Sequence, residues 1–430
     1  MEFIKYPQKA DWSKLCKRPT KETKSLIESV ETILSSVKKE GDAALRSFCQ
    51  KFDGYAPDNF RVSEAEINES ENKISPLLKQ AIEQARRNIS TFHTEQLLEE
   101  KRIQTTSGVF CWQKQTPIEK VGLYIPGGSA PLFSTVLMLG IPAKIAECNE
   151  IIICTPANKN GEIHPAILYA AKAIGIRKIF KIGGAQAIAA MAYGTESIPK
   201  VYKIFGPGNQ YVTTAKQLVS LNDVAIDMPA GPSEVAIIAD AGANPIFVAA
   251  DMLSQAEHGT DSQSILITDC EQLANDVFTE IEQQLEALSR NEIAKKSLAH
   301  SKIILVKDLE EAVHFSNEYA PEHLILAVRN DESIAECITN AGSVFLGDYS
   351  PESAGDYASG TNHTLPTNGY AKMYSGVNID SFTRKITFQK ITRDGLKNIG
   401  NAIEIMAENE GLTAHKNAVT LRLDYDENDL

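Results

Sequence analysis

The chain has 430 residues, enough for two or three domains with substantial cores. Its formal charge of −13 argues against a nucleic-acid partner, whose phosphates need a basic surface, and against binding to an anionic membrane. No stretch is long and apolar enough to span a bilayer, and no secretory signal opens the sequence. The seven cysteines are scattered without a Cys-x-x-Cys pair, so we expect reduced thiols and a cytoplasmic protein.

Residues 1 to about 115 are expected to be mostly helical. Between Ser25 and Lys39, for example, apolar residues recur with a helical period. From Lys120 onward, short β-branched runs alternate with helical stretches. Strands are predicted at 121–125, 150–154, 178–182, 201–205 and 224–226, with helices at about 133–146, 165–174, 185–193 and 209–219. This alternation predicts a parallel sheet with helices on both faces.

A second run with the same alternation begins after Ser233. Strands are predicted at 235–239, 264–267, 303–306, 323–326 and 343–346, with a helix at 244–258 after the first of them. Two consecutive lobes of similar pattern suggest an internal duplication at the level of the fold, although no sequence repeat is visible. Residues 347–375 are expected to form a long loop, and such loops are usually functional or disordered. A helix is predicted at about 394–409.

Several oxygen and imidazole donors are candidates for a metal site. Gln255 and His258 are three residues apart at the end of a predicted helix, so both should project from the same face. Asp356 and His363 lie in the long loop, and His415 lies near the C-terminus. Together these residues offer the donor types that zinc accepts. Because they are far apart in the sequence, each one alone is also explained by an ordinary position on the solvated surface or at a helix N-cap.

Glycine-rich turns follow several predicted strands, at 126–128, 183–184 and 206–208. Such turns let a ligand approach the backbone, and a helix N-terminus behind them favours phosphate. Neither G-x-G-x-x-G nor a P-loop is present, so tight turns that need glycine for backbone reasons remain the alternative. Glu322 and His323 are an adjacent acid and imidazole at the start of a strand. They are either an acid–base pair or a surface pair.

From about Val121 to Arg422 the chain resembles the histidinol dehydrogenase family. The resemblance rests on motifs in order: VGLYIPGGSAPLFSTVLML, GGAQAIAA, KIFGPGN, IDMPAGPSE, DMLSQAEHG, APEHL, GDYASGTNHTLPT and GLTAHKNAVTLR. It implies an α/β fold of two consecutive incomplete Rossmann-like lobes with parallel sheets, a helical N-terminal region and an extended C-terminal arm. The expected parts are a helical region at 1–115, a cofactor-binding lobe at 116–232, a zinc and substrate lobe at 233–375, and a dimerisation arm at 376–430.

The resemblance also implies an activity. Members oxidise L-histidinol to L-histidine through L-histidinaldehyde, the last steps of histidine biosynthesis, with two NAD+ in succession and one zinc (Zn2+) per subunit of a homodimer. The implied zinc ligands are Gln255, His258, Asp356 and His415, the last donated across subunits. The implied substrate contacts are Ser233, Gln255, His258, His323, Asp356, His363, Glu410 and His415. The implied NAD contacts are Tyr124, Gln186 and Asn209.

The resemblance assigns the chemistry to two residues. His323 would take the alcohol proton in the first hydride transfer, and Glu322 would activate water for the second oxidation. Two other functions remain open. A zinc-dependent hydrolase would use the same ligands with a metal-bound water and no nicotinamide cofactor, and a non-catalytic dimeric α/β binding protein would keep only the fold.

Overall fold

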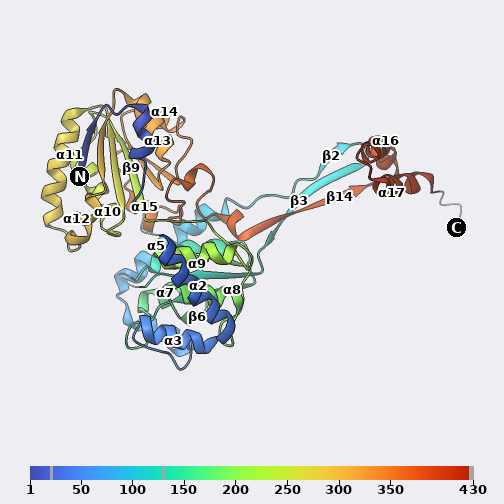
Figure 1. Cartoon of the computed structure of the whole chain (residues 1–430), viewed down its shortest axis with the longest axis horizontal. Helices are drawn as coiled ribbons and strands as arrows, with labels where there is room; N and C mark the ends of the chain where they lie inside the picture. Colours follow the sequence, from blue (N-terminus) through green and yellow to red (C-terminus); the bar gives the residue numbers. More distant parts are fainter. Residues whose placement is uncertain (20–22, 128–130, 426–430) are drawn as a thin grey trace. The chain divides into compact units, whose positions relative to one another are not determined.

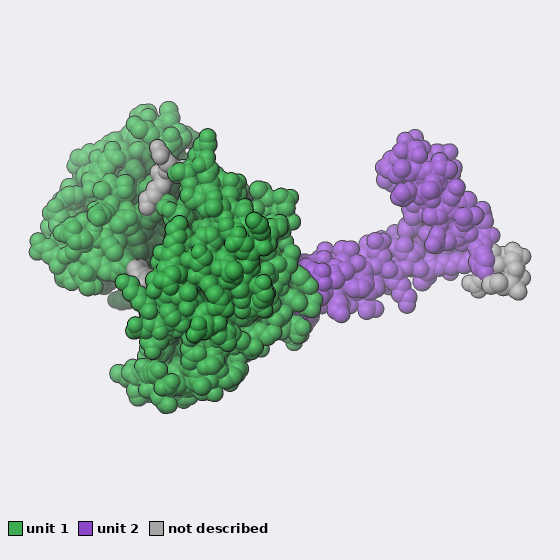
Figure 2. All heavy atoms as spheres, turned by 60° about the horizontal axis from the view of Figure 1, so that its bottom comes forward, with its two compact units in different colours: residues 1–96, 118–382 green, residues 97–117, 383–430 purple. Residues whose placement is uncertain are grey.

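The computed structural model describes residues 1–19, 23–127 and 131–425, which form two compact units (Figure 2). Unit 1 comprises Met1–Gln96 and Ile118–Phe382, and unit 2 comprises Leu97–Pro117 and Thr383–Leu430. Among the described helices none is long and apolar enough to cross a membrane. The division into four parts that is expected from the sequence stays a prediction.

The first sheet of unit 1 is parallel and has helices on both faces. Its strands, in spatial order, are β6 (Lys178–Lys181), β5 (Glu150–Thr155), β4 (Lys120–Tyr124), β7 (Lys203–Phe205) and β8 (Ala225–Ile226). Val121 and Leu123 pack with α6 (Phe133–Ile145) and α7 (Pro165–Ala173). Ile152 and Cys154 pack on the opposite face with α8 (Gly184–Tyr193) and α9 (Gln210–Ser220). Burial on both faces explains the unbroken apolar runs of these strands.

The second sheet is also parallel. Its strands, in spatial order, are β1 (Glu2–Lys5), β11 (Lys302–Leu305), β10 (Gln263–Thr268), β9 (Glu234–Ala239), β12 (His323–Ala327) and β13 (Ser343–Leu346). One face is covered by α10 (Pro245–Ala256), α11 (Glu271–Glu286) and α12 (Asn291–Leu298). The other is covered by α1 (Trp12–Leu15), α13 (Leu309–Tyr319) and α14 (Asp331–Ala335) (Figure 1).

The two lobes share one strand order. In each, the first strand of the lobe lies in the middle, the second and third extend to one side, and the fourth and fifth extend to the other. These are the first five strands of the dinucleotide-binding order, without the sixth. The predicted fold class of two incomplete Rossmann-like lobes is therefore confirmed. In the second lobe, β1 from the N-terminus adds a strand beside β11.

The N-terminal helices are extra layers on the first lobe. They are α2 (Thr23–Glu40), α3 (Asp42–Phe52), α4 (Glu64–Glu69) and α5 (Pro76–Thr94). Val30 of α2 and Leu45 of α3 belong to the core that also contains α8, whereas Ile67 of α4 and Ile82 of α5 belong to the core that contains α6. Short 3-10 turns occur at η1 (Lys9–Asp11), η2 (Ser70–Lys73), η3 (Tyr370–Lys372) and η4 (Ile379–Phe382).

Unit 2 is an antiparallel ribbon with two helices. The ribbon has the order β14 (Thr383–Ile391), β3 (Val109–Pro117) and β2 (Ile103–Thr106), and the helices are α16 (Arg393–Asn409) and α17 (Thr413–Asp424). Gly108 makes the β2–β3 turn with a φ of +79°. All of β14 except its first residue is exposed, including the apolar side chains of Ile386 and Phe388.

Three local predictions need correction. Residues 103–117 form strands rather than continuing the N-terminal helices, because this stretch combines β-branched and aromatic residues with a Ser-Gly turn. The predicted loop at 347–375 contains α15 (Glu352–Tyr357), which is too short to show a helical period. Helix α10 ends at Ala256, so His258 lies two residues beyond the helix rather than on its face.

Candidate active site

The main pocket of unit 1 has a volume of about 1310 Å³ and is lined by both lobes. The first lobe contributes the carboxyl ends of its strands: Tyr124 ends β4, and residues 206–209 follow β7. The second lobe contributes the opposite edge of its sheet, since Ser233 and Glu322 immediately precede β9 and β12. The two sheets therefore face the pocket with different edges.

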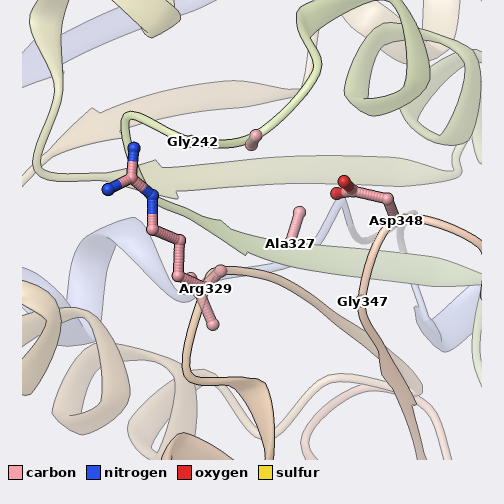
Figure 3. Close-up of a pocket in the computed structure, with 7 residues that line it drawn as sticks. Gly242, Ala327, Arg329, Gly347 and Asp348 are labelled. Atoms are coloured by element: carbon pink, nitrogen blue, oxygen red, sulfur yellow. The ribbon is translucent and has the colours of Figure 1, made fainter.

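A second, smaller pocket of about 210 Å³ lies at the carboxyl ends of β9, β12 and β13 (Figure 3). This is where a dinucleotide-binding sheet usually holds its ligand. Here the Asp240 carboxylate accepts the backbone N–H groups of Gly242 (2.7 Å) and Arg329 (3.0 Å). The Arg329 side chain extends toward the Gly242 loop, opposite Asp348. No residue predicted for the site lines this pocket.

The predicted cofactor residues lie together at the carboxyl edge of the first sheet. Tyr124 is 5% exposed, its hydroxyl accepts the N–H of Gly184 (3.1 Å), and burial raises its pKa to about 12. Gln186 is buried beside Gly184. Asn209 caps α9 by accepting two backbone N–H groups. Gly206 has a φ of +124°, and a Cβ there would lie 2.1 Å from the Tyr124 carbonyl oxygen, so only glycine fits.

A buried ion pair binds the backbone of the Gly206 turn. Lys216 Nζ lies 2.5 Å from Asp227 Oδ1, and the two side chains are 4% and 1% exposed. Lys216 Nζ also donates to the Gly206 carbonyl (2.8 Å), and Asp227 Oδ2 accepts the Gly206 N–H (2.8 Å). Both backbone polar groups of Gly206 are thus held by one pair.

Of the glycine turns predicted from the sequence, that at 126–128 has its last residue outside the described part.

Two of the predicted metal ligands of unit 1, His258 and Asp356, lie close together with Glu352. Nitrogen or oxygen atoms of His258, Glu352 and Asp356 all lie within 4.8 Å of one another. Gln255 is fully buried, yet neither Oε1 nor Nε2 has a hydrogen-bond partner among the described residues. A buried amide without partners is costly and calls for a ligand. An amide, an imidazole and carboxylates are donors that suit zinc, so the residues present fit that metal.

The predicted catalytic pair lies beside this cluster. Glu322 Oε2 accepts the N–H of Glu234 (3.0 Å), which is possible because β12 and β9 are neighbours in the sheet. His323 is 3% exposed; its Nε2 lies 3.7 Å from Asp356 Oδ1 and its Nδ1 lies 3.8 Å from Glu322 Oε2. Burial lowers the pKa of His323 to about 3 and raises the pKa of Glu322 well above its usual range. Burial therefore disfavours the charged form of each group.

The remaining predicted substrate residues divide between the units. His363 is fixed on both sides, by the Asp356 carbonyl at Nδ1 (3.0 Å) and Thr135 Oγ1 at Nε2 (3.2 Å), and burial lowers its pKa to about 4. His258 is exposed to the pocket, although surrounding protein still lowers the pKa of its imidazole by desolvation. Glu410 and His415 belong to unit 2, at the end of α16 and in the first turn of α17, and both are exposed.

Comparison with known proteins places this geometry in a family. A family model described as histidinol dehydrogenase matches residues 16–423. The chain belongs to the histidinol dehydrogenase family. It is 63% identical over 424 residues to a histidinol dehydrogenase of Bacteroides fragilis (strain YCH46), covering 99% of each chain. It is 64% identical over 423 residues to one of Bacteroides thetaiotaomicron, covering 98% of this chain and 99% of that one.

A solved structure agrees with the fold. A histidinol dehydrogenase from Elizabethkingia anophelis superimposes with a TM-score of 0.96 at 55% sequence identity, over 98% of both chains. Membership of the histidinol dehydrogenase family confirms the resemblance inferred from the motifs. Glu352 is the site residue that sequence reasoning missed. Its one signal was a spacing of four residues from Asp356, which places the two on one helical face only if the segment is helical.

Proposed function

We propose that the protein oxidises L-histidinol to L-histidine through L-histidinaldehyde, passing two hydrides in succession to NAD+, with zinc as its resident metal. The observation that carries the proposal is the unpartnered Gln255 amide, which lies in the same lobe as the His258, Glu352 and Asp356 cluster and the Glu322–His323 pair. Family membership supports the same activity. The reaction would stand at the end of histidine biosynthesis, in the cytoplasm.

The donors of unit 1 that would hold zinc are Gln255, His258 and Asp356. When bound, zinc would supply a positive centre that orients the substrate through its imidazole and amino nitrogens. We propose that His415 of a partner subunit completes this set in a homodimer and that its Glu410 contacts the substrate there. Ser233 and His363 line the same pocket and would contact the substrate from within the subunit.

His323 would act in the first oxidation. Its lowered pKa keeps the imidazole neutral at physiological pH, so one ring nitrogen carries a free lone pair. That nitrogen takes the proton of the substrate hydroxyl as hydride leaves the carbinol carbon, and the products of this step are the aldehyde and one reduced cofactor. General base catalysis of this kind is worth roughly 10²–10⁴-fold in rate.

Glu322 would act in the second oxidation. Its carboxylate takes a proton from water, the oxygen adds to the aldehyde carbon, and hydride then leaves the hydrate to give the acid and a second reduced cofactor. A carboxyl whose pKa is raised by burial is a stronger base once it is ionised. The backbone N–H of Glu234 fixes the carboxyl in position.

The cofactor would bind where the first lobe presents its glycine turns. When bound, NAD+ would supply the hydride acceptor. The turn at Gly206 and Gly208 lies at this edge, and the N-terminus of α9 behind it favours the negative charge of a phosphate. Tyr124, Gln186 and Asn209 form the wall of the pocket at this edge.

The test is to count NADH formed per L-histidinol consumed by the zinc-loaded protein, with and without a chelator. The proposal expects two NADH per substrate, lost on chelation and regained when zinc is added back. The variant Glu322→Gln should stop after one NADH, with aldehyde released. No NADH from a protein that holds zinc would reject the proposal and favour a zinc-dependent hydrolase or a binding protein.

A further inference from the structure

Glu352 is a buried carboxyl to which the proposed function gives no role. It is the first residue of α15 and is 0% exposed. Neither carboxyl oxygen has a hydrogen-bond partner among the described residues. An unpaired polar group in the interior is unfavourable and calls for a partner. Asp356 is one helical turn further on, so both carboxyls project toward the same side, where His258 also lies.

One ring nitrogen of His323 also lacks a hydrogen-bond partner. His323 Nδ1 is buried and has no hydrogen-bond partner among the described residues. Glu352 Oε1 lies 3.7 Å from it, so a shift of about 0.8 Å would give an ordinary N–H···O bond. Glu322 Oε2 is at a similar distance of 3.8 Å but already accepts the Glu234 N–H. Of the two carboxyls that face Nδ1, Glu352 is thus the one without a hydrogen bond of its own.

We infer that Glu352 is a positioning residue that accepts the Nδ1–H of His323 and so leaves Nε2 as the basic nitrogen. This inference rests on the proposed role of His323. In neutral imidazole only one nitrogen carries the proton, and the hydrogen bond made by one nitrogen selects the tautomer. Nε2 lies on the side of Asp356, 3.7 Å from its Oδ1, where the substrate would bind. The opposite tautomer would present an N–H to the substrate and could not take its proton.

Glu352 could instead be a zinc ligand, because its oxygens lie within the same 4.8 Å cluster. Two observations favour the positioning role. The Gln255 amide also lacks partners and offers the metal an oxygen. His323 Nδ1, by contrast, is buried without a hydrogen-bond partner among the described residues, and of the two carboxyls that face it Glu322 already accepts the Glu234 N–H. The two roles predict different zinc contents for a Glu352 variant. Replacing a zinc ligand would lower the zinc content, whereas replacing a positioning residue would leave it unchanged.

The experiment uses the zinc-loaded full chain and the isosteric variant Glu352→Gln. A glutamine amide can donate to Nδ1 and so favours the wrong tautomer without emptying the space. We expect zinc content and the KM for L-histidinol to stay near wild type, and kcat to fall roughly 100-fold or more, the scale of a lost general base. Glu352→Asp should recover part of that loss. Asp223→Asn, the same chemical change at a half-buried carboxyl that pairs with Lys38 and does not line the main pocket, is the control and should keep wild-type kcat.

A second readout needs no turnover. Ring ¹⁵N shifts in histidine-labelled protein, with the His323 signal assigned through His323→Asn, should show Nδ1–H in the wild type and Nε2–H in Glu352→Gln. Zinc lost from Glu352→Gln would mean that Glu352 is a ligand, and an unchanged kcat with an unchanged tautomer would mean that it has neither role. If the wild type itself formed no NADH, the proposed function would fail, and the tautomer measurement alone would decide this inference.

Discussion

Replacing Lys216 with methionine tests whether a buried ion pair shapes the cofactor turn. The change keeps most of the side-chain volume but removes the charge that lies 2.5 Å from Asp227 Oδ1. Removing one partner of a buried pair costs about 3–5 kcal/mol, because the other charge remains uncompensated. Asp227 would still accept the N–H groups of Gly206 (2.8 Å) and Met228 (2.7 Å). These two bonds to a charged group keep the cost near the lower limit, so we expect about 3 kcal/mol.

The assay should measure the local stability of the Gly206 turn. Hydrogen exchange of a peptide containing Gly206 reports its N–H, which is bonded to Asp227, and about 3 kcal/mol corresponds to roughly a 100-fold loss of protection. Calorimetric titration with NAD+ should show weaker binding, while zinc content stays unchanged. Lys38→Met is the matched control: Lys38 pairs with Asp223 at 3.4 Å with its side chain 61% exposed, so it should cost under about 1 kcal/mol. Equal protection in the two variants would refute the reasoning.

Three further predictions follow from other contacts. Gly206→Ala should weaken NAD+ binding roughly tenfold or more, because a Cβ would lie 2.1 Å from the Tyr124 carbonyl at a φ of +124°, whereas Gly175→Ala, at +75° with nothing within 4 Å, should bind NAD+ normally. His415→Ala should lose zinc, and co-expression with His258→Ala should restore about one site per heterodimer only if His415 acts across subunits. Burial lowers the pKa of His93 by desolvation, so below about pH 6.5 the unfolded chain binds a proton at this imidazole that the folded chain does not bind. The free energy of unfolding, measured with urea, should therefore fall as the pH is lowered, and it should fall less steeply in His93→Gln.

The layout of the sheets was predictable because it depends on local patterns. A strand buried on both faces must be apolar at every position, as Ile151 to Cys154 are, and such runs separated by helical periods allow few arrangements. The strand order within each lobe and the addition of β1 were not predictable, because pairing between β1 and β11 joins residues about 300 apart in the sequence and leaves no local signal.

The candidate site was predictable only in part, for a similar reason. Gln255 and His258 have a recognisable spacing, and Glu322 and His323 are adjacent, so each pair stands out by itself. Glu352 looks like any surface glutamate in the sequence, and only the packing of α15 buries it beside His323. Lys216 is equally ordinary until the fold places Asp227 next to it. Burial decides the chemistry of these groups, and burial is a property of the whole fold.

The edges of the two sheets explain how one pocket can serve two purposes. Phosphate binding needs glycine turns and helix N-termini, which parallel βα units place at the carboxyl edge of a sheet, and the first lobe presents that edge through Gly206 and α9. Helices run antiparallel to the strands, so the last turn of α10 brings Gln255 to the amino edge of the second sheet, beside the residues that precede β9 and β12. A metal site and an acid–base pair need side chains rather than bare backbone, and this edge supplies them. The carboxyl edge of the second lobe holds the 210 Å³ pocket beside Arg329. Two lobes with one strand order thus acquire different roles through the edges that they turn toward the shared pocket.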